Sequence, residues 1–69
     1  MKIAELDIPR SVWEHLIDEW IFSQRDRLIM KRRLLDGVCF EELAEEFHLS
    51  TQRVKSVVYG HQTKLFEHI

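Results

Sequence analysis

The chain has 69 residues, of which 45% are hydrophobic and 32% are charged, and its formal net charge is −2. This length accommodates one small domain, residues 1–69, and the composition is typical of a folded chain rather than a disordered one. The single cysteine excludes an intramolecular disulfide, and no apolar run reaches the roughly 18 residues of a membrane span, so we expect a cytoplasmic protein without a membrane partner.

The first predicted helix follows Pro9 and belongs to an acidic N-terminal segment, residues 1–22. Its start has two readings: Asp7 as the N-cap with Pro9 in the first turn, or a capping box formed by Ser11 and Glu14. Apolar residues recur in adjacent pairs every four positions, which places them on one stripe of an amphipathic helix. They are Val12, Trp13, Leu16, Ile17, Trp20 and Ile21. We interpret both tryptophans as packing residues, and this helix is also the candidate surface for a homodimer.

The second predicted helix begins at Ser23, an N-cap with Asp26 at the reciprocal position of a capping box. We expect Gly37 to end this helix in a left-handed conformation. A third, shorter helix is predicted over residues 40–47, with Cys39 at its N-cap position. Its apolar face comprises Phe40, Leu43, Ala44 and Phe47.

The fourth predicted helix begins after Ser50, its N-cap, and continues to about Phe66. Gly60 either ends this helix near Tyr59 or lies within it at a cost of about 1 kcal/mol, and the apolar positions beyond it favour continuation. No alternation typical of strands appears in the sequence, so we predict an all-α domain of about four helices.

Helices three and four are separated only by His48 and Leu49, so they must meet at a sharp corner. We expect this corner to pack through Leu43, Ala44, Leu49, Val54 and Val57. Two helices joined in this way have the layout of a helix-turn-helix, whose second helix enters the DNA major groove. The sequence therefore predicts a C-terminal helix-turn-helix.

Residues 33–50, RLLDGVCFEELAEEFHLS, together with the basic run TQRVKSV at 51–57, resemble region four of bacterial sigma factors, their C-terminal promoter-recognition domain. The resemblance covers roughly residues 23–66. The matching positions are Gly37, Glu42, Leu43, Ala44, Leu49, Ser50, Arg53 and Val54. This resemblance implies a bacterial or phage transcription regulator that binds double-stranded DNA, with RNA polymerase or a sigma factor as a further partner.

The resemblance also implies which residues face DNA. These are Thr51, Gln52, Arg53, Lys55 and Ser56, and the candidate phosphate contacts are Arg33, Cys39, Phe40 and Lys64. Arginine and lysine reach guanine acceptors or phosphates, and glutamine bonds adenine through two hydrogen bonds. The alternative reading of the same residues is a solvated helix face that recognises nothing.

Three residues depart from the family pattern. Cys39 stands where the family has a hydroxyl cap that also touches phosphate, and Arg32 stands where an apolar residue is usual. His48 replaces the glycine of the turn, and we expect it to adopt a positive φ, which histidine tolerates better than most residues.

The negative net charge argues at first sight against nucleic-acid binding, but the charge changes sign along the chain. Residues 1–22 hold five acidic and two basic residues, and residues 23–36 hold two acidic and five basic residues. Residues 37–49 hold four acidic residues and no basic one, and residues 50–69 hold one acidic and three basic residues. The predicted recognition helix is itself positive. The acidic run Glu41, Glu42, Glu45 and Glu46 supports an alternative function, an adaptor that binds RNA polymerase or a sigma factor without reading DNA.

Catalytic and metal-binding motifs do not emerge from the sequence. The four histidines, at positions 15, 48, 61 and 68, lack the spacing of zinc ligands, so we expect no metal site. Cys39 has no neighbouring base that would activate it, and we interpret it as a buried or capping thiol. We expect neither enzymatic activity nor a cofactor.

Overall fold

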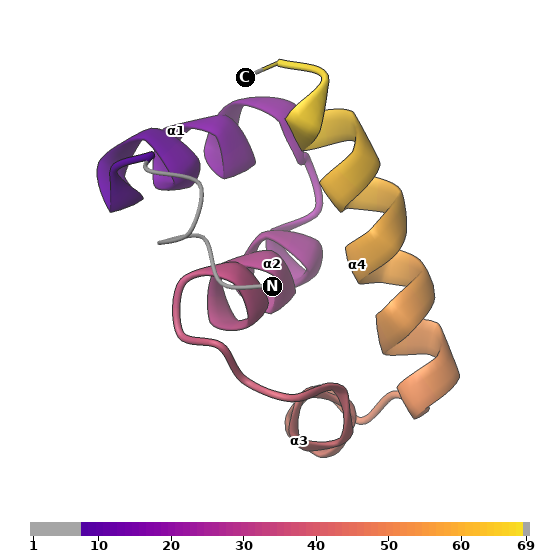
Figure 1. Cartoon of the computed structure of the whole chain (residues 1–69). Helices are drawn as coiled ribbons and strands as arrows, with labels where there is room; N and C mark the ends of the chain where they lie inside the picture. The colour runs from indigo at the N-terminus through magenta and orange to yellow at the C-terminus, as the bar shows by residue number, and fades with distance from the viewer. Residues whose placement is uncertain (1–7, 69) are drawn as a thin grey trace.

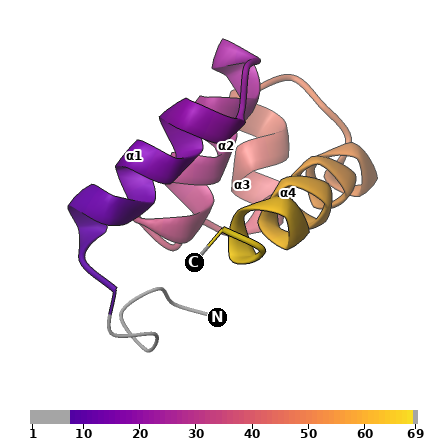
Figure 2. The same cartoon turned by 90° about the horizontal axis from the view of Figure 1, so that it is seen from above.

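The computed structural model describes residues 8–68, which form four helices joined by short turns. The helices are α1 (Arg10–Trp20), α2 (Gln24–Leu34), α3 (Phe40–Glu46) and α4 (Thr51–Phe66). α4 contacts the other three: α3 lies beside its first turns and the end of α1 lies beside its last turns (Figure 1; Figure 2). No strand occurs in residues 8–68, which confirms the predicted all-α class.

The core lies between the four helices, and no polar or charged residue within 8–68 is buried in it. Its members are Trp13, Leu16, Ile17, Ile21, Ile29, Met30, Leu34, Leu43, Ala44, Val54, Val58 and Leu65. The stripe predicted on α1 faces this core, so Trp13 is confirmed as a packing residue. Trp20 is half-buried and stacks on His68 with ring centroids 3.8 Å apart. The apolar face of α1 is therefore largely occupied within one chain.

The N-caps of α2 and α4 are confirmed, whereas the capping box that Ser11 and Glu14 would form at the start of α1 is wrong. Ser23 Oγ accepts a hydrogen bond from the Asp26 N–H at 3.3 Å, and Ser50 Oγ accepts one from the Arg53 N–H at 3.1 Å. The reciprocal bond of the capping box predicted at Ser23 does not form within residues 8–68, because the Asp26 carboxylate binds Arg25 and His61 instead. α1 begins one residue after Pro9, so Ser11 lies inside the first turn and does not cap. Pro9 is itself the N-cap residue, and because its side chain has no oxygen it makes no capping hydrogen bond. Asp7 lies outside the described residues.

The turns adopt the backbone conformations that the sequence predicts. Gly37 follows the end of α2 with φ +70°, and the Val38 N–H closes the turn by donating to the Arg32 carbonyl at 3.2 Å. His48 has φ +56° between α3 and α4. Gly60 lies within α4, which continues to Phe66 as expected. None of the helices in residues 8–68 is long and apolar enough to cross a membrane.

Candidate nucleic-acid interface

The corner between α3 and α4 fixes the orientation of α4. The Leu49 N–H donates to the Ala44 carbonyl at 2.9 Å, which draws the turn back onto α3. Leu43, Ala44 and Val54 are buried, and Leu49 packs against them in a half-buried position, as does Val57. This packing agrees with the predicted corner. Because one face of α4 is held in this way, the opposite face of its first turns is turned towards solvent.

The predicted DNA-facing residues gather on this solvent-facing side of α4. Gln52, Arg53, Lys55 and Ser56 are exposed, whereas Thr51 is half-buried. With 3.6 residues per turn, these four exposed residues span a little less than half of the helix circumference. The structure therefore brings together four of the five predicted residues as one polar, basic surface.

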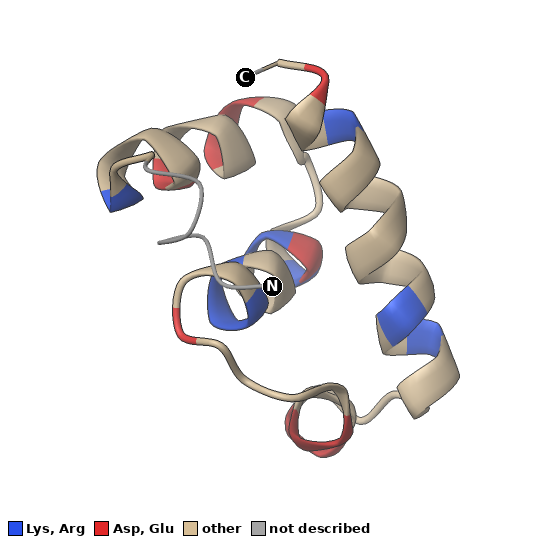
Figure 3. Cartoon of the chain, in the orientation of Figure 1, with Lys and Arg blue, Asp and Glu red and all other residues tan. Residues whose placement is uncertain are grey.

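Three of the five basic residues of α2 pair with an acidic side chain, whereas Arg27 and Arg33 donate to backbone carbonyls instead. On α2, Arg25 pairs with Asp26 at 3.0 Å, Lys31 with Asp18 at 2.9 Å, and Arg32 with Glu46 at 2.7 Å. On α4, by contrast, the lysines and the arginine make no ion pair with any residue in the range 8–68. These are Arg53, Lys55 and Lys64. The positive charge of α4 thus remains available to an anionic partner (Figure 3).

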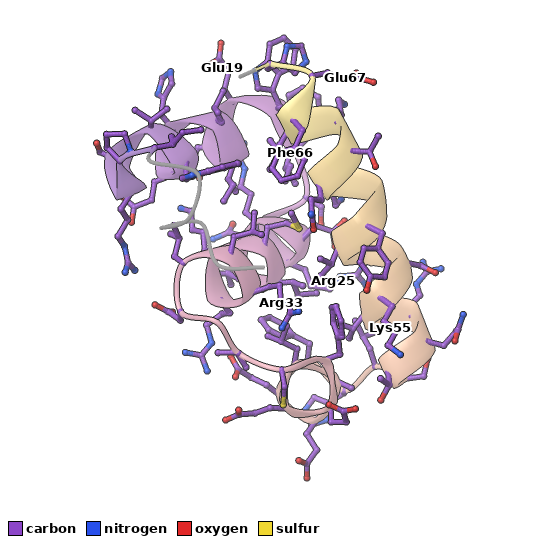
Figure 4. All side chains as sticks on the ribbon, viewed as in Figure 1. Glu19, Arg25, Arg33, Lys55, Phe66 and Glu67 are labelled. Atoms are coloured by element: carbon purple, nitrogen blue, oxygen red, sulfur yellow. The ribbon has the colours of Figure 1, made fainter. Side chains whose placement is uncertain are left out.

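Two of the candidate phosphate contacts, Arg33 and Phe40, lie together with Lys55 and Tyr59 in what we call the Phe40 cluster. The Arg33 guanidinium lies 4.1 Å from the Phe40 ring centroid and donates from Nη1 to the Val38 carbonyl at 3.0 Å. Lys55 Nζ lies 5.8 Å from the same centroid, and the Tyr59 ring meets Phe40 edge-on at 5.7 Å. Figure 4 shows Arg33 and Lys55 in the region where α2, α3 and the first turns of α4 meet.

Of the other two phosphate candidates, Lys64 lies apart from this cluster, and Cys39 directly precedes Phe40 in the chain. Lys64 belongs to the last turn of α4, where its Nζ lies 5.9 Å from the ring centroid of the exposed Phe22. Cys39 is exposed at the N-cap of α3, and its side chain caps no backbone N–H. The interpretation of Cys39 as a buried or capping thiol is therefore wrong. The structure therefore places Lys64 at the opposite end of α4 from the other three candidates.

The acidic residues of α3 form a negative flank next to the basic face of α4. Glu41, Glu42 and Glu45 are exposed and make no ion pair with residues 8–68, whereas Glu46 is bound by Arg32. Figure 3 shows this change of sign between α3 and the first turns of α4. A polyanion that approaches α4 is therefore attracted on one side and repelled on the other, which restricts its orientation.

Two residues that matter here were not predicted. His61 Nε2 lies 2.9 Å from Asp26 Oδ2, so the middle of α4 is tied to the first turn of α2. Burial alone raises the pKa of Asp26, but the hydrogen bonds from His61 and Arg25 outweigh it and lower the pKa below the usual value. Tyr59 was missed as well, although its position seven residues after Gln52 places it on the same helix face.

Within residues 8–68, no group of three or more histidine, cysteine, aspartate or glutamate side chains is placed to hold a metal ion. Comparisons with protein-family models, with curated proteins and with solved structures find no significant match to this chain.

Proposed function

We propose that this protein is a small DNA-binding transcription regulator whose helix α4 enters the major groove. The observation that carries the proposal is the exposed face of α4, on which Arg53 and Lys55 make no ion pair within residues 8–68. The corner with α3 supports it, because helix-turn-helix proteins present their second helix to the groove in this way. The resemblance to sigma-factor region four, carried by residues 33–57, favours a target in promoter DNA.

The residues of this face have the chemistry that base recognition requires. Arg53 suits the paired acceptors of guanine, and Gln52 suits adenine, which offers one donor and one acceptor in the major groove. Lys55 suits a phosphate, since its ammonium group is a point charge without the planar geometry of arginine. One short helix neutralises few phosphates, so affinity is modest and decreases as salt increases. A second copy of the chain or RNA polymerase would supply further binding energy.

A titration of duplex DNA, followed by amide chemical shifts at low salt, tests the proposal. We expect the shifts to concentrate at Gln52, Arg53 and Lys55. Replacing Lys55 with glutamine should reduce the slope of log K against log salt by about 0.9, the contribution of one phosphate contact. Lys31→Gln is the matched control, because Lys31 is paired with Asp18 on another part of the molecule. Equal losses in both variants, or no shifts on α4, would contradict the proposal.

A second candidate function is an adaptor that binds RNA polymerase or a sigma factor through the acidic flank of α3. Glu41, Glu42 and Glu45, which are exposed and make no ion pair with residues 8–68, favour it, together with the net charge of −2. Reversing the charge at Glu41 and Glu45 should then abolish capture of purified polymerase, and Arg53→Ala should leave capture unchanged. The opposite pattern, with DNA binding lost only in Arg53→Ala, supports the first candidate.

A further inference from the structure

We propose that Tyr59 is a further DNA-contacting residue, which donates a hydrogen bond from its hydroxyl to a phosphodiester oxygen. This inference rests on the proposed function of α4 and adds a contact that neither the sequence pattern nor the resemblance assigns. Tyr59 is 56% exposed, and its hydroxyl forms no hydrogen bond with any residue between 8 and 68. A tyrosine that is held by its ring and free at its hydroxyl is a suitable donor for an anionic oxygen.

The position of Tyr59 along α4 favours phosphate rather than a base. Tyr59 lies on the same face as Gln52 and Ser56, at spacings of seven and three residues. It is eight residues beyond Thr51, which corresponds to about 12 Å along the helix axis. The major groove is itself about 12 Å wide. A helix that enters the groove with its N-terminus at the base edges therefore brings Tyr59 to the groove wall, where the phosphates lie.

The Phe40 cluster holds the ring of Tyr59 in place. Phe40 meets that ring edge-on, with the centroids 5.7 Å apart and the planes at 63°. Phe40 is in turn covered by the Arg33 guanidinium at 4.1 Å. A ring that is oriented before binding loses less conformational entropy when it binds. A larger share of the free energy of the hydroxyl hydrogen bond therefore remains as binding affinity. Phe40 is thus a positioning residue for Tyr59.

The charge around Tyr59 also matches a phosphate. Lys55 precedes it by one helical turn, so the two side chains are neighbours on the surface of α4. The Lys55 ammonium and the Arg33 guanidinium both lie within 6 Å of the Phe40 ring that Tyr59 contacts. Two cations and the tyrosine ring therefore contact the same aromatic ring, and arginine, lysine and tyrosine are among the side chains that contact phosphates.

The experiment compares Tyr59→Phe with the wild-type protein on a mixed-sequence duplex and on a duplex selected by the wild type from a random pool. Tyr59→Phe removes one oxygen and keeps the ring against Phe40. We expect about a tenfold loss of affinity, the effect of one hydrogen bond to a charged group. The loss should be equal on both duplexes, and the salt slope should stay unchanged because no cation is removed.

Thr63→Ala is the matched control, since it removes a hydroxyl one turn further along α4 that already bonds the Tyr59 carbonyl at 3.0 Å. In a Phe40→Leu background, with folding checked by circular dichroism, the effect of Tyr59→Phe should fall to about threefold or less. Wild-type affinity in Tyr59→Phe, or a loss confined to the selected duplex, would overturn the phosphate contact alone. Absence of any binding by the wild type would overturn the proposed function and this contact together.

Discussion

Asp26 and His61, 35 residues apart in the sequence, meet at 2.9 Å and join the first turn of α2 to the middle of α4. Both side chains are partly buried, so water weakens their interaction less than it weakens a fully exposed ion pair. The contact lies behind the exposed face of α4. It therefore stabilises the orientation of the helix that we propose to enter DNA.

We expect acid to weaken the contribution of Asp26 to stability. Its pKa is lower in the folded protein than in the unfolded chain, so the stabilisation is present above the ordinary value of about 3.9 and is lost as pH falls below it. Asp26→Asn should lower the free energy of unfolding by about 1 to 2 kcal/mol at neutral pH. Urea unfolding of both proteins should show this difference shrinking below about pH 4. A difference that stays constant with pH would contradict the assignment.

A cycle with His61→Gln provides the control for this contact. If the two residues stabilise the fold through each other, the double variant should be destabilised by less than the sum of the two single variants. Additive effects at neutral pH would show that Asp26 acts through Arg25 instead, which also bonds its carboxylate.

We expect alanine substitution at the two glycines, Gly60 and Gly37, to change the free energy of unfolding in opposite directions. Gly60 lies within α4, and a Cβ there would meet nothing within 4 Å, so Gly60→Ala should stabilise the protein by about 0.5 to 1 kcal/mol. Gly37 also has open space around it but has φ +70°. Gly37→Ala should therefore destabilise by about 1 to 2 kcal/mol, from backbone strain alone. Thermal unfolding of the pair measures both effects, and a shift in the same direction would refute this account.

The backbone conformation at position 48 favours glycine over alanine in the turn between α3 and α4. Its φ of +56° lies in the left-handed region, where a Cβ is unfavourable. The His48→Gly variant should therefore be more stable than His48→Ala by about 1 kcal/mol. Ser56 is exposed within α4, where alanine is the better helix former. There, Ser56→Ala should be more stable than Ser56→Gly by about 1 kcal/mol. Denaturant midpoints of the four variants test the pair of rankings.

Ala44 sets how closely α3 approaches α4. It is buried between them, so Ala44→Leu adds three carbons to a packed crossing and should destabilise by about 1 to 3 kcal/mol. Glu45→Leu places the same side chain on the exposed side of α3 and should change stability by less than about 0.5 kcal/mol. Equal stability of the two variants would show that the crossing is loosely packed.

Most of the helical architecture could be predicted from the sequence, because its signals act over a few residues. Ser23 and Ser50 each cap an N–H three residues further on, and Gly37 and His48 adopt the positive φ expected of them. The capping box of Ser11 and Glu14 was predicted wrongly because several polar residues lie near the start of α1 and the sequence does not rank them. The DNA contacts predicted on α4 stay predictions.

By itself the sequence determined the all-α class, the order of four helices and the polar face of α4, since periodicity and capping are local properties. Only the tertiary structure decided which charges are neutralised and which remain available. Lys31 and Arg32 are as basic in the sequence as Lys55, yet both are bound by acidic residues of other helices. The Phe40 cluster and the Asp26–His61 contact have the same origin, because packing brings together residues whose separation in the chain gives no local signal.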